Sequence, residues 1–377
     1  MGGRVQLKHL RVEGEPETLG QNHGEELREE IAKSLELYRV WFQEVGGLDW
    51  EQVLLQASSF IPELQAGAPE LLLEMQGIAA GARVPLEAIV ALNSRTEIAY
   101  GCSGVLSSGR GASGESAIAE CTAAGISSSA AVDGHTYIGQ NWDWRHTHLE
   151  ITVLLTIVKP GAPRLLTLTE AGMVGKLGLN AAGLGLCFNL LATSRNQLGL
   201  PAHVLARQVL EQWRLDRALQ VVIRAQRAGA GNFLLGYYDL QAGAGEVANL
   251  EWAATDFNVT FPDCGYVVRT NHFLQPIAGA VDRIKFFKAA GLSTYIRLAR
   301  ARHLLAQFAA EGRLGRESLE TVFRDHYNYP RAICSHPVPE EGELSQSNVS
   351  VIMDLTEGTL AYTGGPPCRA TYRYLRV

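Results

Sequence analysis

The chain changes character at residue 121, and this change limits the folds that it can adopt. Residues 18–101 carry apolar side chains at a spacing near 3.6, which predicts a series of amphipathic helices. Residues 107–116 are mostly glycine, serine and alanine, a composition typical of a loop. From Cys121 onward, short apolar runs alternate with turn residues, and Asp133-Gly134 is a strong hairpin signal. The sequence therefore predicts a helical N-terminal region followed by a β-rich core.

The strand-like runs form groups with helices between and after them. Strands are expected at 126–131, 136–140, 151–157, 165–169, 176–179, 185–189, 233–238, 246–251, 258–261, 350–355, 359–362 and 369–374. Helices are expected at 201–210, 215–225, 294–310 and 317–323. Because the connections between neighbouring strands are short, the strands should pair antiparallel. We expect an α+β protein in which two antiparallel sheets pack face to face with helices outside, a four-layer αββα sandwich.

Composition argues against several classes of partner. The 33 basic and 39 acidic residues are mixed along the chain without a basic cluster, which disfavours nucleic-acid binding. No apolar run is long enough to span a membrane, and the first residues lack an apolar signal region. We therefore expect no membrane segment and a cytoplasmic location.

The sequence predicts neither a disulfide framework nor a cofactor. The six cysteines are widely spaced without a C-x-x-C pair, so they are expected to be buried thiols with one reactive member among them. His146 and His148 could ligate a metal, but no third ligand follows at metal-site spacing. Gly183-Leu-Gly185 precedes no helix, unlike a dinucleotide fingerprint. No metal or cofactor is expected.

Cys121 is the candidate nucleophile. It begins an expected strand directly after the small-residue segment, and the next strand ends with Asn141 and Asp143. A strand start beside polar residues gives a thiol access, rigidity and neighbours that can orient charge. Free cysteines are more often buried and inert, however, and the residues alone leave that alternative open.

Six sequence blocks, taken together, resemble one known family. In chain order they are LNSRTEI (92–98), CT (121–122), GQNWDW (139–144), TEAGMVGKLGLNAAGLGLCFNLL (169–191), RTNHF (269–273) and ICSHP (333–337). The combination resembles the isopenicillin-N acyltransferase (acyl-coenzyme A:6-aminopenicillanic acid acyltransferase) family, which are cysteine members of the N-terminal-nucleophile hydrolases. Residues 20–27 and 350–374 fit as well, so the resemblance runs over nearly the whole chain.

The resemblance implies the fold of these hydrolases and self-cleavage between Glu120 and Cys121. Residues 1–120 would form a helical prosegment, and residues 121–377 a catalytic core that begins with the nucleophile. A free α-amine has a pKa of about 7.7–8.0, so it can accept the thiol proton near neutral pH. Glu120 stands where the family commonly carries glycine, which permits a strained backbone. Either the carboxylate is accommodated and acts as a base, or cleavage is slow or absent.

The resemblance also assigns roles to four other residues. Asp143 would hold the amine of the nucleophile, and the side chain of Asn271 would donate to the oxyanion. Thr122 would supply a hydroxyl at the processing site, and Arg297 would lie near the active site. Each has a structural alternative: a strand-end turn for Asp143, an Asx-turn for Asn271, an ordinary strand residue for Thr122 and a solvated helix face for Arg297.

Two further residues, Arg95 and Glu97 in the first block, have three open interpretations. They form a buried pair within the helical region, they line the pocket, or they make an ordinary salt bridge on a helix face.

The expected reaction is cleavage or transfer of the acyl group of a small N-acyl amide or thioester through a Cys121 thioester. Hydrolysis is favoured, because no glycine-rich phosphate loop or basic cluster suggests a coenzyme A site. The two cleaved chains are expected to stay associated, and a homo-oligomer is left open. One alternative is a choloylglycine or penicillin V acylase-like hydrolase, although the long helical segment argues against it. Another is a non-catalytic binding or scaffold protein that retains the fold.

Overall fold

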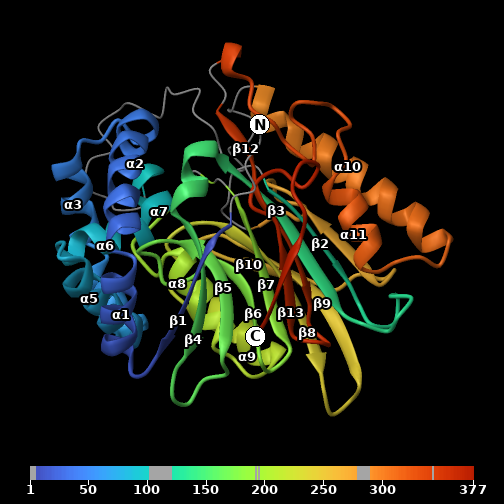
Figure 1. Cartoon of the computed structure of the whole chain (residues 1–377), viewed down its shortest axis with the longest axis horizontal. Helices are drawn as coiled ribbons and strands as arrows, with labels where there is room; N and C mark the ends of the chain where they lie inside the picture. Colours follow the sequence, from blue (N-terminus) through green and yellow to red (C-terminus); the bar gives the residue numbers. More distant parts are fainter. Residues whose placement is uncertain (1–5, 102–120, 192, 194–195, 278–288, 342–343) are drawn as a thin grey trace.

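The computed structural model describes residues 6–101, 121–191, 193, 196–277, 289–341 and 344–377. Two β-sheets lie between layers of helices (Figure 1). Strands β2 and β3 of one sheet pack against β7 and β8 of the other, so the sheets meet face to face. The predicted α+β class and the four-layer arrangement are confirmed.

The larger sheet has eight strands in the order β1-β4-β5-β6-β7-β8-β9-β10. These strands are β1 (Lys8–Glu13), β4 (Thr152–Val158), β5 (Leu165–Glu170), β6 (Leu177–Asn180), β7 (Leu184–Leu190), β8 (Gly231–Asp239), β9 (Ala244–Trp252) and β10 (Phe257–Thr260). Neighbouring strands pair antiparallel except β1 and β4, which run parallel from Lys8 opposite Val153. The N-terminal region therefore adds its own strand to the sheet, which the sequence analysis did not predict.

The smaller sheet has six antiparallel strands in the order β11-β2-β3-β12-β13-β14. These strands are β11 (Tyr266–Arg269), β2 (Cys121–Ile126), β3 (Tyr137–Arg145), β12 (Ser345–Asp354), β13 (Thr359–Tyr362) and β14 (Arg373–Arg376). Cys121 lies opposite Trp142 in the pairing of β2 with β3. The strand expected at 126–131 is wrong beyond Ile126, because backbone hydrogen bonds from Ala130 and Ala131 to Ser127 close a turn there.

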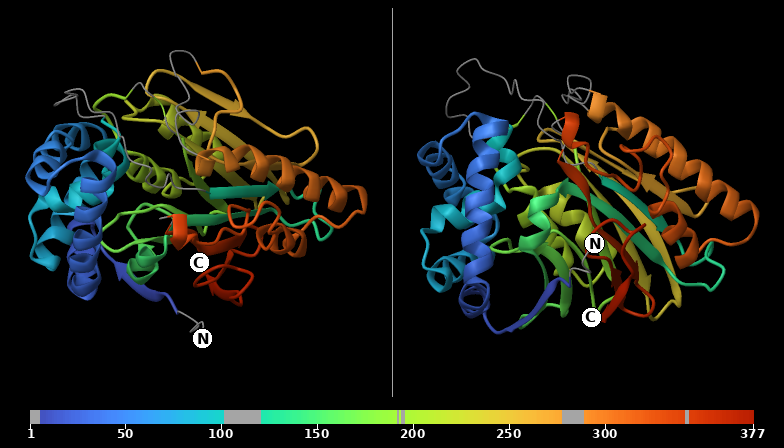
Figure 2. Two further views of the ribbon diagram at one scale, coloured as in Figure 1. Left: turned by 90° about the horizontal axis from the view of Figure 1, so that it is seen from above. Right: turned by 45° about the horizontal axis from the view of Figure 1, so that its top comes forward.

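Helices cover both outer faces. The helices are α1 (Pro16–Glu26), α2 (Arg28–Gly46), α3 (Trp50–Ser58), α4 (Ile61–Gly67), α5 (Pro69–Ala82), α6 (Leu86–Asn93), α7 (Arg95–Ala99), α8 (Ala202–Leu210), α9 (Leu215–Arg224), α10 (Ala289–Ala310) and α11 (Arg316–Phe323), with 3₁₀ turns η1 (His146–Ile151) and η3 (Pro339–Glu341). Helices α8 and α9 pack on the larger sheet, and α10 and α11 on the smaller one. Helices α1–α7 lie on the side of the molecule opposite α10 and α11 (Figure 2). Within the described ranges, no helix is both long and apolar enough to cross a membrane.

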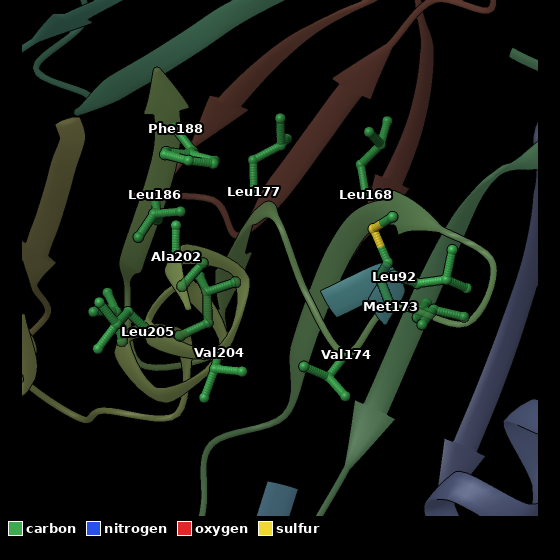
Figure 3. Close-up of a cluster of buried hydrophobic side chains, with 14 of the residues drawn as sticks. Leu92, Leu168, Met173, Val174, Leu177, Leu186, Phe188, Ala202, Val204 and Leu205 are labelled. Atoms are coloured by element: carbon green, nitrogen blue, oxygen red, sulfur yellow. The ribbon is translucent and has the colours of Figure 1, made fainter. Parts of the chain in front are cut away.

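The N-terminal helices share one hydrophobic core with the sheets. A continuous cluster of buried side chains extends from Leu7 through helices α1–α7 and both sheets to Tyr362. Figure 3 shows part of it, where Leu92 of α6 lies near Met173 in the loop after β5. The helical region is therefore a packed component of the fold, and it reaches the segment that precedes β6.

Helices α1 and α5 approach each other through glycines. A Cβ atom on Gly20 would clash with the backbone carbonyl of Glu74, and one on Gly77 with that of Glu17. Only the absence of side chains allows the two backbones to touch. This crossing fixes the position of α5, whose Glu74 side chain points to the core.

Candidate active site

Three buried side chains hold the backbone of Cys121. Its N–H donates to Asn271 Oδ1 at 2.7 Å. Its carbonyl oxygen accepts from Arg297 Nη1 at 2.7 Å and from Asn189 Nδ2 at 3.3 Å. The Cys121 residue itself is only 2% exposed, and its side chain belongs to the core between the two sheets. The start of β2 is thus fixed at both of its backbone polar groups.

Arg297 links the strand start to Asn271. The residue lies on α10 and is 1% exposed, so it is not a solvated helix-face residue. Besides the carbonyl of Cys121, its guanidinium donates to Thr122 Oγ1 at 3.0 Å and to Asn271 Oδ1 at 3.2 Å. The structure therefore brings Cys121, Thr122, Asn271 and Arg297 together from three elements that are far apart in the sequence.

The orientation of the Asn271 amide follows from its neighbours. Its oxygen faces two donors, the N–H of Cys121 and Nη2 of Arg297, whereas its Nδ2 donates to the carbonyl of Leu190 at 3.1 Å. An amide oxygen can accept from two donors and an amide nitrogen cannot, so the assignment is unambiguous. In this geometry Asn271 is an acceptor for the nitrogen of Cys121. Its Nδ2 carries a second N–H besides the one bound to Leu190, and this N–H is the one that could donate to an oxyanion.

Asp143 lies beside the thiol on β3. Its Oδ1 accepts from Ser347 Oγ at 2.6 Å, and Ser347 is its register partner on β12. Its negative charge contributes to the raised pKa of Cys121, whereas a hydrogen bond from its backbone N–H to the thiol opposes that rise. Asn141, two residues earlier, instead donates to the carbonyls of Phe323 and Ile333 at 2.8 Å each. Asn141 therefore anchors the segment after α11, whereas the charge of Asp143 acts on the thiol of Cys121.

Burial raises the pKa of the Cys121 thiol to about 11. The charge of Asp143 contributes to this rise, and the charges of Lys176 and Arg297 oppose it. In the uncut chain the thiol is therefore protonated at neutral pH. Its activation requires a nearby group that accepts a proton or stabilises the thiolate.

Lys176 is such a group, although no motif in the sequence marks it as a site residue. Its Nζ lies 3.1 Å from the ring centroid of Trp142, the register partner of Cys121. Nζ also lies 3.3 Å from Glu170 Oε2. Burial lowers the pKa of Lys176 to about 7, although the charge of Glu170 opposes this shift. Lys176 can thus exchange a proton near neutral pH beside the thiol, and its only sequence signal is a lone lysine in a glycine-rich apolar block.

Glu170 connects Lys176 to the helical region. It accepts from Tyr38 Oη at 2.8 Å and pairs with Arg95 Nη2 at 3.0 Å. Burial alone would raise the pKa of Glu170, but the charges of Lys176 and Arg95 hold it at about 2. Arg95 therefore forms a buried ion pair with the core. It makes neither a pair within the helical region nor a surface salt bridge.

The loop at 171–175, between Glu170 and Lys176, is held by side chains of the helical region. Ser34 Oγ donates to the carbonyl of Ala171, and His23 Nε2 accepts from the N–H of Gly172. Asn93 makes two bonds, one to the carbonyl of Gly172 and one from the N–H of Val174. Buried backbone groups need such partners, so the helical region fixes the loop that positions Lys176.

A small cavity borders this site. Its lining includes Glu97 and Tyr100 from the helical region and Leu190 at the end of β7. Leu190 is the residue whose carbonyl binds Asn271 Nδ2. Glu97 also accepts from the N–H of Ala202 at 2.8 Å, so this carboxylate caps α8 as well as lining the cavity.

The sequence also singled out Glu120, the segment 107–116 and the two histidines His146 and His148. Glu120, the residue expected before the cleavage point, lies outside the described residues, as does the segment 107–116. His146 and His148 lie in η1 and not on a strand. His148 is buried with its ring edge-on to Tyr38 and Trp144, and His146 contacts the carbonyl of Leu344.

Known proteins include relatives of this chain in sequence and in structure. The sequence is 27% identical over 333 residues to "Acyl-coenzyme A:6-aminopenicillanic-acid-acyltransferase 40 kDa form" of Emericella nidulans, covering 87% of this chain and 84% of that protein. Among solved structures, the chain is similar to a mutant of conjugated bile acid hydrolase from Clostridium perfringens (TM-score 0.44, 10% identity, 68% of this chain and 97% of that chain). It is also similar to penicillin V acylase from Agrobacterium tumefaciens (TM-score 0.43, 11% identity, 68% and 86%).

The family model described as "Acyl-coenzyme A:6-aminopenicillanic acid acyl-transferase" matches residues 130–355. This range includes Asp143, Asn271 and Arg297, and it ends at Leu355, the residue after β12. Because the match covers more than half of the chain, the protein belongs to the acyl-coenzyme A:6-aminopenicillanic acid acyl-transferase family.

Proposed function

We propose that the protein is a self-processing cysteine hydrolase that carries the acyl group of a small N-acyl amide or thioester on Cys121. One observation carries the proposal. The nitrogen of Cys121 is fixed 2.7 Å from Asn271 Oδ1 at the start of a central strand, with Asp143 and Lys176 close to the thiol. Family membership supports an enzyme of acyl transfer or amide hydrolysis.

Self-cleavage would begin with attack of Cys121 Sγ on the carbonyl carbon of Glu120. The peptide C–N bond breaks as the nitrogen of Cys121 takes up a proton, and the acyl group of Glu120 moves to sulfur. Water then hydrolyses the thioester, leaving a carboxylate on Glu120 and a free thiol. Residues 1–120 and 121–377 become separate chains, and the new α-amine keeps Asn271 Oδ1 as its acceptor.

In turnover, that α-amine would accept the thiol proton as sulfur attacks the substrate carbonyl. The amine has an ordinary pKa of about 7.7–8.0, and the charge of Asp143, which acts on the thiol, would also stabilise the protonated amine. The proton then passes to the departing amine of the substrate, and water or a second amine resolves the thioester. Thr122 and Arg297 keep the strand start in place throughout.

Unpaired polar atoms on buried amide side chains support a polar substrate. Asn189 and Asn232 face each other across β7 and β8, and Asn189 Nδ2 reaches the carbonyl of Cys121. Among the described residues, Asn189 Oδ1 and both amide atoms of Asn232 have no hydrogen-bond partner. Buried polar groups are nearly always paired, so a polar ligand is expected between the sheets here.

We propose hydrolysis of small N-acyl amides as the main reaction, in the cytoplasm, with the two cleaved chains remaining associated. A panel of N-acyl amides and acyl thioesters, assayed with and without an amine acceptor, separates hydrolysis from acyl transfer. Intact-mass measurement should show two chains, the larger beginning at Cys121. An uncut chain that still turns over would contradict the cleavage step. An electrophilic thiol probe should label Cys121, and failure to label would favour a non-catalytic scaffold.

Replacing Asn271 with leucine should lower kcat by about 10²–10³, the loss typical when one preorganised polar group of such a site is removed. The change removes the acceptor for the nitrogen of Cys121 and for Arg297. Asn258→Ala on the edge strand β10 is the control and should keep full activity. Activity of the Asn271 variant within threefold of the parent would exclude a role in the site.

Replacing Lys176 with methionine should shift the pH dependence of Cys121 alkylation to higher pH. Up to about pH 7 Lys176 is protonated and its charge favours the thiolate, so its loss reduces the thiolate fraction in this range. Peptide mass spectrometry of iodoacetamide-treated protein measures the profile at Cys121. Lys176→Arg restores a cation and should move the profile back, while Lys33→Met, on an exposed side chain, should leave it unchanged. Identical profiles for the parent and Lys176→Met would contradict the assignment.

A further inference from the structure

Four metal-ligand side chains meet at a point outside the site described above. His326, Cys334 and His336 lie in the segment after α11, and Cys368 lies between β13 and β14. Each offers one ligand atom, and these atoms all lie within 4.8 Å of one another. Both cysteines are free thiols in this structure.

Three of the six separations between these atoms match the edges of a tetrahedron around a small ion. His326 Nε2 and His336 Nε2 are 3.1 Å apart, and His336 Nε2 lies 3.7 Å from Cys334 Sγ and 3.5 Å from Cys368 Sγ. Tetrahedral zinc, with Zn–N of about 2.0–2.1 Å and Zn–S of about 2.3 Å, gives edges of about 3.3 Å between nitrogens and about 3.6 Å between nitrogen and sulfur. Each observed edge lies within a few tenths of an ångström of these values.

Hydrogen bonding alone does not explain the cluster. Three groups converge on His336 Nε2: one ring nitrogen and two thiols. A ring nitrogen has either one proton or one lone pair, so it can serve one of the three. Four ligand atoms gathered within 4.8 Å of one another are instead the arrangement that a bound metal ion would explain.

We propose that His326, Cys334, His336 and Cys368 form a structural zinc site. Two imidazoles and two thiolates in tetrahedral positions are a donor set that suits zinc. Four protein ligands leave no open position, which is the feature of a structural and not a catalytic site. The spacing of the ligands along the chain resembles no common zinc motif, because Cys368 lies 32 residues beyond His336.

The proposed ion would brace Asp143. Ser335, between two of the ligands, exchanges two hydrogen bonds with Ser347: its N–H donates to Ser347 Oγ, and its carbonyl accepts from the N–H of Ser347. Ser347 Oγ in turn donates to Asp143 Oδ1 at 2.6 Å. By tying this segment to Cys368, zinc would limit the movement of Ser347 and hence of the carboxylate beside the nucleophile.

Metal analysis of the purified full chain tests the site directly. Mass spectrometry of the metal content should find one equivalent of zinc per chain. Cobalt added to metal-free protein should produce thiolate-to-cobalt absorption and the visible bands of tetrahedral cobalt. Cys334→Ser and Cys368→Ser should lose the zinc, whereas Cys264→Ser, at an exposed cysteine outside the cluster, should keep it. If the cluster variants fail to fold, the cobalt spectrum of the parent chain shows whether the four side chains bind a metal.

Two results would overturn the proposal. One is a purified chain without zinc whose reduced form binds neither zinc nor cobalt on titration. The other is a disulfide between Cys334 and Cys368 found by non-reducing peptide mapping of freshly purified protein. Cys121→Ala should retain the zinc, so a failure of metal binding is distinguishable from a failure of the proposed nucleophile.

Discussion

Replacing Cys121 with alanine should give a chain that is neither cut nor active. Loss of a nucleophile that acts as a unit with its base lowers kcat by a factor on the order of 10⁶. Alanine fits the site without strain because its side chain is smaller than the buried thiol that it replaces. Intact-mass measurement should show one chain of 377 residues, and the amide panel should show no turnover.

Two further variants sharpen this result. Cys264→Ser changes an exposed cysteine and should leave cleavage and turnover as in the parent. Cys121→Ser keeps a nucleophilic atom of lower acidity, so we expect slower cleavage than in the parent. Cleavage of Cys121→Ala at residue 120 would assign the self-processing step to another residue or to a contaminating protease.

Replacing Glu74 with leucine should destabilise the protein by about 3–5 kcal/mol, because it leaves the charge of Arg207 buried without its main partner. Glu74 on α5 and Arg207 on α8 are bound through two hydrogen bonds of 2.8 and 2.9 Å, and both side chains are buried. Glu211, the other carboxylate at Arg207, is partly exposed and binds only Nε. The pair joins the helical region to the core.

This prediction is best measured in the Cys121→Ala background, where unfolding involves a single chain. Thermal and urea midpoints should fall in Glu74→Leu and recover in part in the double variant Glu74→Leu/Arg207→Leu, because a buried pair can be replaced by apolar residues of similar volume. In the cleaved protein, the segment 1–120 should separate from 121–377 on size exclusion at a lower urea concentration than in the parent. Unchanged midpoints would mean that the ion pair does not hold the two regions together.

Much of the fold could be predicted from the sequence, because the periodicity of apolar side chains depends on local secondary structure. The helices before residue 101 and most strands follow from the spacing of apolar side chains. Strand β1 was missed, because most of its residues are exposed or partly exposed and its one paired edge lies against β4, more than 140 residues away. The strand expected at 126–131 was placed too far along the chain, because the serines after Ile126 form a turn in the structure.

The site was predictable only where a motif marked it. The resemblance to the family pointed to Asp143, Asn271 and Arg297, which the structure places around Cys121; their catalytic roles stay predictions. Lys176, Asn189 and Ser347 were missed, because their surroundings come from elements distant in the sequence. The cluster at His336 was missed for the same reason, since its fourth member comes from another loop.

The shared core has a practical consequence for producing the enzyme. Tyr38 and Arg95 bind Glu170, the partner of Lys176. After cleavage, the N-terminal segment would therefore still form part of the active site. Self-cleavage would then cut the chain, but the N-terminal segment would stay bound to the mature enzyme. A gene truncated to begin at Cys121 should yield an unstable polypeptide, and an engineered two-gene system would need to supply both pieces in the same cell.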